Sequence, residues 1–186
     1  MEHKFGANWT VLKLEALKEY LSFYTQALKK QPFTLIYIDG FAGTGQVSIK
    51  DGSDRRIIDG SAKIALNTTP PFKHIYLVDN KPKHAKALRK LCDELDAKHA
   101  SVHEGDANKE IIGLLNKVRW NGTRAVMFLD PYGLSVEWAT LEAIANTKAV
   151  DIWFLFPLSG LARQAARNYA AVDPSCQVPI DHKLSF

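Results

Sequence analysis

The chain has 186 residues, which suits one domain with a sizeable hydrophobic core and leaves little room for a second. Hydrophobic residues make up 46% and charged residues 24%, a balance that excludes disordered, collagen-like and coiled-coil proteins. The net charge of +4 is compatible with nucleic-acid binding but does not indicate it. The two cysteines, Cys92 and Cys176, stand far apart, so neither a disulfide framework nor a metal site is predicted.

No segment has the sequence of a membrane anchor or a secretory leader. The longest apolar run, 149–158, is interrupted by Asp151 and Pro157, and residues 1–30 carry charges throughout. We therefore expect a cytoplasmic protein. Residues 1–186 are expected to form one domain, with residues 1–30 as a helical segment packed on it.

Between residues 10 and 28, apolar side chains recur every three or four positions, which predicts an amphipathic helix. Apolar, β-branched runs then alternate with helical patterns. Strands are expected at 33–38, 75–78, 100–103, 125–129 and 150–156, and helices at 60–67, 81–97, 109–117 and 136–146, the first of these capped by Ser61. This alternation predicts an α/β fold of the Rossmann-like, doubly wound type, a mostly parallel sheet with helices on both faces.

Four of the expected strands are followed by an aspartate, at positions Asp39, Asp79, Asp106 and Asp130. In an open parallel sheet, ligands bind at the edge where the carboxyl ends of the strands lie. Aspartate is also a common turn and helix-capping residue, so a structural role remains an alternative for each one. Their recurrence in successive units predicts several carboxylates around one crevice.

The turn after the first expected strand is rich in glycine. Gly43 and Gly45 permit a tight turn and a close approach of a ligand to the backbone. The turn lacks the lysine and hydroxyl residue of a phosphate-binding P-loop, and its glycine spacing is not the full dinucleotide fingerprint. An NAD-linked oxidoreductase is therefore a weak alternative, and a plain strand-ending turn is the other.

This turn resembles the first motif of class I S-adenosylmethionine-dependent methyltransferases, D-x-F-x-G-x-G, at four positions: Asp39, Phe41, Gly43 and Gly45. The resemblance implies S-adenosylmethionine as cofactor, with the turn against its methionine part. It also implies that Asp79 binds the ribose hydroxyls and that Asp106 contacts the adenine amino group. No metal ligand is implied.

The turn after the fourth expected strand, Asp130-Pro131-Tyr132-Gly133, occupies the place of the fourth methyltransferase motif. It resembles the D-P-P-Y turn of enzymes that methylate exocyclic nitrogens of bases and the D-P-F-G turn of tRNA guanine-N2 methyltransferases. The resemblance implies that Asp130 and the Pro131 backbone orient the acceptor amino group while Tyr132 stacks on the base. The alternative is that Asp130 and Pro131 merely end a strand and Tyr132 packs beneath a loop.

As a whole, the chain resembles the three-Cys-motif partner protein family (TcmP) up to about residue 167. The matching segments are residues 9–20, residues 37–45, Gly60-Ser61 at the start of a helix, and residues 129–133. The resemblance implies a methyltransferase-like protein whose partner carries a three-cysteine motif and looks like a radical S-adenosylmethionine protein. Function therefore has two readings, a methyltransferase acting on a nucleic-acid base or a non-catalytic partner subunit.

Two features depart from the methyltransferase pattern. Asp39 and Asp79 are 40 positions apart, whereas about 20 is usual, and the excess is a polar segment, 46–59, expected to act as a lid or substrate-reading loop. After residue 156 only a helix at 161–171 is expected, so the last two strands are missing or supplied from elsewhere. Trp9 and Lys13 are candidates to close over the cofactor, with packing and surface solubility as their plainer roles.

Overall fold

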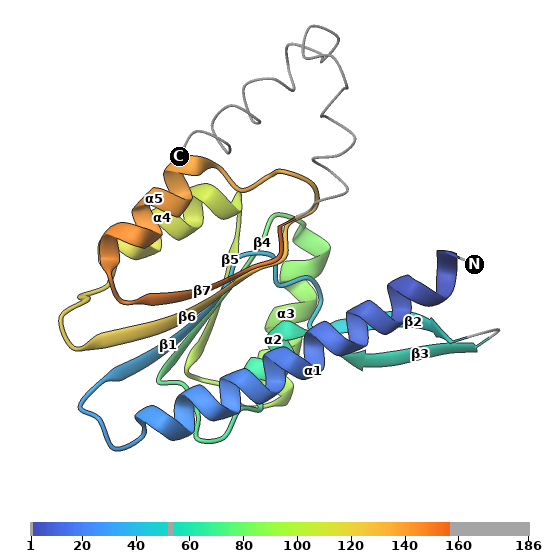
Figure 1. The fold of residues 1–186 in the computed structure, drawn as a ribbon, viewed down its shortest axis with the longest axis horizontal. Coiled ribbons are helices and arrows are strands. Elements are labelled where there is room, and N and C mark those ends of the chain that lie inside the picture. The colour runs from blue at the N-terminus through green and yellow to red at the C-terminus, as the bar shows by residue number, and fades with distance from the viewer. Residues whose placement is uncertain (1, 52–53, 157–186) are drawn as a thin grey trace, which may run out of the picture.

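The computed structural model describes residues 2–51 and 54–156 (Figure 1). Helices and strands alternate along the chain after a long first helix. Their order is α1 (Glu2–Leu28), β1 (Thr34–Asp39), β2 (Gln46–Asp51), β3 (Asp54–Asp59), α2 (Ser61–Leu66), β4 (His74–Asp79), α3 (Pro82–Glu94), β5 (Ala100–Glu104), α4 (Ala107–Lys117), β6 (Thr123–Leu129), α5 (Trp138–Thr147) and β7 (Val150–Phe154).

Five of the strands form one parallel sheet in the order β5-β4-β1-β6-β7. Counted along the sheet strands alone, this is the order 3-2-1-4-5 of the doubly wound Rossmann-like fold. The chain winds outward from β1 to β5 and then returns to β6 on the other side of β1. The expected fold class is therefore confirmed, and the switch in winding direction places a crevice at the carboxyl ends of β1 and β6.

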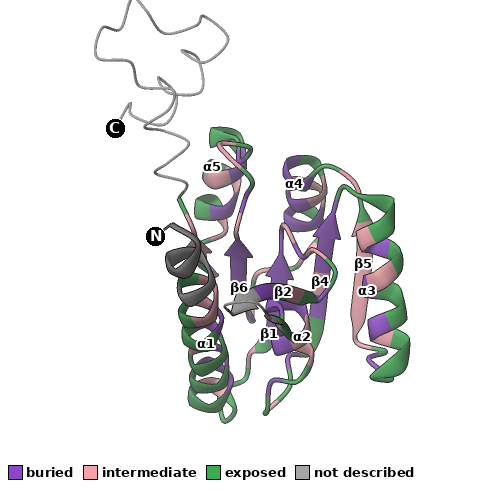
Figure 2. Cartoon of the chain, turned by 90° about the vertical axis from the view of Figure 1, so that its right-hand side faces the viewer, coloured by how far each residue is buried: buried purple, intermediate pink, exposed green. Residues whose placement is uncertain are grey.

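Alternating residues of the central strand face two separate hydrophobic cores. Leu35 and Tyr37 pack with α1, α2 and α3 on one face, while Ile36 and Ile38 pack with α4 and α5 on the other. Figure 2 shows this arrangement as buried central strands between partly exposed helices. The continuous apolar run of β1 follows from this burial on both faces.

Helix α1 begins at Glu2, earlier than the expected start at residue 10, and ends at Leu28 as expected. Leu17 and Leu21 are fully buried in the first core, whereas Trp9 and Phe23 remain 61% and 71% exposed. The helix thus packs one stripe of apolar side chains on the domain. Its amino-terminal half runs beside the β2–β3 pair (Figure 1).

The polar segment 46–59 forms an antiparallel hairpin of β2 and β3, where a loop was expected. The Gly60 N–H donates to the Gly45 carbonyl at 2.9 Å, so the hairpin leaves and rejoins the domain at one point. Helix α2 consequently begins directly beside the glycine turn despite the 14-residue insertion. Two further corrections concern ends of helices: Gly60 and not Ser61 is the N-cap of α2, and α3 ends at Glu94, before the left-handed Asp96 with φ of 48°.

The predicted helix at 161–171 and the question of the last two strands fall outside the described residues. Within the described part of the chain, no helix is both long enough and apolar enough to cross a membrane.

Candidate functional site

The glycine turn after β1 has a backbone that only glycine accommodates easily. Gly43 and Gly45 have φ values of 63° and 79°, in the left-handed region. A Cβ atom at Gly45 would lie 2.4 Å from the Leu91 Cδ2 atom of α3, whereas one at Gly43 would meet nothing within 4 Å. Gly45 is thus fixed by conformation and packing, and Gly43 by conformation alone.

Asp39 lies buried at the base of this turn, with none of its surface exposed. Its carboxylate accepts hydrogen bonds from the Phe41 N–H at 3.2 Å, the Tyr37 hydroxyl at 3.3 Å and the Ser61 side chain. Burial raises the pKa of Asp39 from 3.8 to about 6 despite these bonds, and the nearby Asp130 carboxylate adds to the increase. The protein therefore keeps a costly carboxyl group under the turn.

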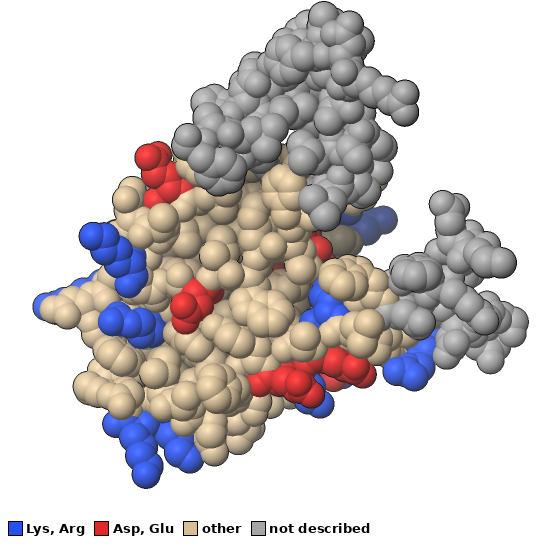
Figure 3. Space-filling view, viewed as in Figure 1, with Lys and Arg blue, Asp and Glu red and all other residues tan. Residues whose placement is uncertain are grey.

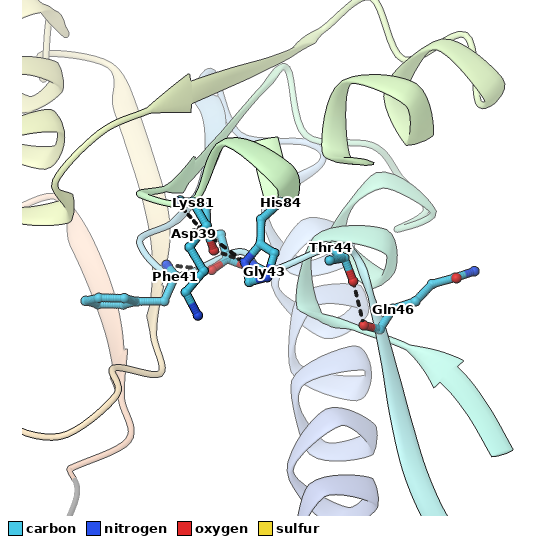
Figure 4. A network of polar contacts seen from close by, with 8 residues as sticks. Asp39, Phe41, Gly43, Thr44, Gln46, Lys81 and His84 are labelled. Carbon is cyan, nitrogen blue, oxygen red and sulfur yellow. Dashed lines mark hydrogen bonds and ion pairs between the residues drawn. The ribbon is translucent and has the colours of Figure 1, made fainter. Parts of the chain in front are cut away.

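Asp79, at the end of β4, ties the glycine turn to the start of α3. Its Oδ2 atom accepts from the Gly43 N–H at 2.9 Å, and its Oδ1 atom contacts the Lys81 N–H at 2.9 Å and the His84 Nδ1 atom at 3.1 Å (Figure 4). A carboxylate has about four lone-pair positions, so one on Oδ2 is left for a further donor. Sequence reasoning placed Asp79 at the site but did not foresee this bond to the glycine turn.

Asp106 follows β5 and begins α4. Its Oδ1 atom accepts from the Lys109 N–H at 3.1 Å, which makes it the N-cap of that helix. The turn before Asp106 is linked to the end of β4, because the Gly105 N–H donates to the backbone carbonyl of Asp79 at 3.2 Å. Asp106 therefore caps α4, as the structural alternative for this residue expects, and its contact with adenine stays a prediction.

Phe41 lies between the glycine turn and the second core. Its backbone N–H serves Asp39, while its half-buried ring packs against the core on the α4 and α5 face. Figure 4 shows the ring pointing away from the polar network. The phenylalanine of the motif thus anchors the turn to the sheet.

Asp130, at the end of β6, forms an ion pair with Lys13 of α1. The two residues are 117 positions apart, and only 14% of the lysine side chain and 37% of the aspartate side chain are exposed. The sequence alone suggests for Lys13 a role in closing over the cofactor, in packing or in surface solubility. It instead joins α1 to the predicted acceptor turn, a contact without any signature in the sequence.

The rest of the predicted acceptor turn divides into a buried and an exposed residue. Pro131 is buried, whereas Tyr132 is 98% exposed. The alternative in which Tyr132 packs beneath a loop is therefore wrong, because its ring has almost no protein contact. An exposed tyrosine ring of this kind is available for stacking.

The site brings together residues from the carboxyl ends of neighbouring strands. Asp39 and Asp130 follow adjacent strands and interact electrostatically, while Asp79 and the Asp106 turn follow the next two strands on the other side. The arrangement offers carboxylate acceptors along one edge of the sheet, whereas the Gly40, Gly43 and Gly105 N–H groups already donate to acceptors within the protein. Such an edge suits an elongated ligand with hydroxyl and amino groups.

No family model matches the chain, and no curated protein matches it. Among solved structures, it is similar to a Legionella pneumophila protein assigned to the family model DUF519, with a TM-score of 0.59 and 18% identity over 83% of this chain and 71% of that one. At 18% identity this likeness shows the Rossmann-like fold alone.

Two more distant structures give lower scores. YhhF of Escherichia coli, provisionally named a methyltransferase, has a TM-score of 0.47 and 18% identity over 75% of this chain and 66% of its own. A conserved hypothetical protein of Streptococcus pyogenes has a TM-score of 0.42 and 17% identity over 68% of this chain and 69% of its own.

Proposed function

We propose that this chain binds S-adenosylmethionine at the carboxyl edge of its sheet and transfers the methyl group to an acceptor. The observation that carries the proposal is the pair Asp39 and Asp79 around the Gly43–Gly45 turn. Asp39 is kept buried with a raised pKa, and Asp79 holds the turn from a neighbouring strand. A buried carboxyl group with a raised pKa is costly, and such groups cluster at functional sites.

The glycine turn, Asp79 and Asp106 can each serve one part of the cofactor, while the buried Asp39 and the packed Phe41 ring support the turn. The Gly43 N–H of the turn is donated to Asp79, so the glycines would serve the methionine part by allowing its close approach to the backbone, and the remaining lone pair of Asp79 suits a ribose hydroxyl. Asp106 is exposed, and one carboxylate oxygen is not used by its helix cap, so it suits the adenine amino group. A dinucleotide would also use an acidic residue after the second strand, which makes NAD the necessary comparison ligand.

The acceptor is proposed to be an exocyclic nitrogen of a nucleic-acid base. Tyr132 supplies the exposed stacking face, and Asp130 supplies a carboxylate that can accept from an amino group. Lys13 holds this carboxylate in place from α1. Methyl transfer depends mainly on the alignment of nitrogen, methyl carbon and sulfur, so positioning groups of this kind suffice.

A second candidate is a non-catalytic subunit of a complex. The observation that favours it is the same ion pair, because Lys13 already engages the Asp130 carboxylate that the acceptor would need. The resemblance to the TcmP family supports this candidate, with a partner that carries a three-cysteine motif and resembles radical S-adenosylmethionine proteins. In this candidate the cofactor edge is retained while acceptor chemistry is absent.

Transfer of a labelled methyl group from S-adenosylmethionine distinguishes the two candidates. The purified chain is incubated with total RNA, heat-denatured DNA or a protein extract, and label in each acceptor is counted. The methyltransferase proposal predicts label in nucleic acid that is lost in Asp130→Ala and kept in Asp93→Ala, an exposed aspartate of α3. Bound cofactor without transfer to any acceptor would favour the non-catalytic subunit.

A further inference from the structure

The net charge of +4 does not form one basic field on the face over which α1 runs. Figure 3 shows acidic and basic side chains interspersed there. A groove on the face of the sheet that α4 covers combines cations with aromatic rings.

The groove has a volume of about 470 Å³, its floor is made by β4 and β5, and its wall is α4. Thr34 and Thr123, at the amino ends of β1 and β6, also line it, so it extends toward the edge opposite the proposed cofactor site.

The floor of this groove carries a row of aromatic side chains. His74 and Tyr76 lie two residues apart on β4, and His103, which is opposite Val78 on the neighbouring strand β5, contacts the Tyr76 ring. The ring centroids of His74 and Tyr76 are 6.4 Å apart, and those of Tyr76 and His103 are 5.9 Å apart. All three side chains are half-buried or exposed, consistent with the half-exposed edge strand β5 in Figure 2. Aromatic rings on an open sheet face are a usual platform for unpaired bases.

Cations border this row of rings. Lys109 and Lys117 lie on α4 and Arg119 follows it, and all three are exposed. At the rise of an α-helix, the two lysines are about 12 Å apart along its axis, which is room for about three nucleotides stacked at ~3.4 Å. Among the described residues that line the groove, Glu110 is the only acid, and it contacts the His103 Nδ1 atom at 3.4 Å. The lining is therefore net positive.

A glycine in the wall keeps the groove wide. Gly113 lies within α4, where glycine is a poor helix former. A Cβ atom there would meet nothing within 4 Å, so packing does not require glycine at this position. Gly113 lines the groove, and any longer side chain would project into it. This absence of a side chain fits a ligand that lies against the helix.

We propose that this groove binds a single-stranded segment of nucleic acid, with bases stacked on Tyr76 and the two histidines and phosphates beside Lys109, Lys117 and Arg119. Duplexes keep their base faces stacked and would not use the rings, and an acidic peptide would use only the cations. None of the residues assigned to the cofactor or the acceptor lines the groove, although the Lys109 N–H donates to Asp106. Variants at Tyr76, Gly113 and Lys117 therefore test this proposal independently of methyl transfer.

Binding is measured by fluorescence anisotropy, without cofactor, using a labelled RNA of mixed sequence of about 12 nucleotides at about 50 and about 200 mM salt. We expect Tyr76→Leu, which keeps apolar packing, to weaken binding by about fivefold or more. Lys117→Gln should lower the slope of log affinity against log salt by about 0.7. Gly113→Gln should weaken binding although the change favours the helix.

The matched controls are Phe23→Leu, an exposed ring on α1, and Lys86→Gln, an exposed cation on α3, and both should bind like the wild type. Thermal unfolding of every variant checks the fold. The proposal is overturned if the RNA does not bind at low salt, or if the groove variants bind as tightly as their controls. Equal affinity for a duplex of the same length, or for adenosine monophosphate, would also overturn it.

Discussion

Replacing Asp39 by asparagine removes the buried carboxyl group and keeps a carbonyl oxygen to accept from the Phe41 N–H. Burial raises the pKa of Asp39 from 3.8 to about 6, so the folded protein holds this proton more tightly than the unfolded chain. The tighter proton binding therefore adds fully to the free energy of unfolding below pH 3.8. This contribution is lost as pH rises through about 6. Asparagine does not titrate, and its contribution stays constant.

The size of this effect follows from the shift. Two pKa units correspond to about 3 kcal/mol, of which about 2 to 3 kcal/mol fall between pH 4 and pH 7.5. The amide brings a constant cost for altered hydrogen bonds to Tyr37 and Ser61. That cost cancels when the free energies of unfolding of the two proteins are compared at the two pH values. Asp39→Asn should gain about 2 to 3 kcal/mol relative to wild type on going from pH 4 to pH 7.5.

Urea unfolding of both proteins at the two pH values measures this difference. Asp96→Asn is the control, because Asp96 is exposed and its left-handed backbone tolerates asparagine. Asp39→Asn, and not Asp96→Asn, should bind S-adenosylhomocysteine more weakly, since sites are often stabilised at the expense of function. A stability difference that does not change with pH would refute the reasoning that Asp39 is a desolvated carboxyl.

Substitutions at four further residues test three separate parts of the site. Gly45→Ala should destabilise the protein by about 2 kcal/mol or more and Gly43→Ala by about 1 kcal/mol, measured by urea unfolding, because only the former also collides with a leucine of α3. Lys13→Met should cost about 1 kcal/mol, and less at high salt, because Asp130 is more than a third exposed. Asp106→Asn should keep the cap of α4 and its stability but weaken S-adenosylhomocysteine binding in calorimetry, whereas Asp106→Ala should also lose about 1 kcal/mol.

The parallel sheet could be predicted because its determinants are local. The apolar runs of β1 and β6 are continuous, as burial on both faces requires, and their alternation with helices implies right-handed crossovers. The aspartates at the strand ends could be predicted for the same reason. Element bounds differ mostly by one or two residues, where side-chain caps and fraying decide the ends.

The hairpin of β2 and β3 was missed although its sequence carried a signal. Val47 and Ile49 alternate with polar residues, and the sequence Gly52-Ser53 between the two strands is typical of a two-residue hairpin loop. Only one face of the hairpin packs on the domain, so most of its residues are polar. This polar composition indicates a loop more strongly than the short alternation of apolar residues indicates strands. The Gly45–Gly60 hydrogen bond that joins the two ends of the hairpin depends on tertiary packing.

The contact between Lys13 and Asp130 could not have been predicted from the sequence. It joins the first helix to the fourth strand of the sheet, and nothing in either local pattern specifies the other. Ser61 was likewise predicted as a helix cap, whereas it hydrogen-bonds Asp39. Both cases arise where α1 and α2 meet the carboxyl edge, a geometry that only the folded chain defines.

Calorimetric titration with S-adenosylhomocysteine, and separately with NAD, tests the cofactor site most directly. Wild type is compared with Asp79→Asn, which replaces the carboxylate that holds the glycine turn by an amide. Asp96→Asn is the exposed control. We predict that wild type and Asp96→Asn bind S-adenosylhomocysteine and not NAD, and that Asp79→Asn loses about tenfold or more in affinity. Failure of the wild-type chain to bind S-adenosylhomocysteine, or binding of NAD in its place, would contradict the proposed cofactor site.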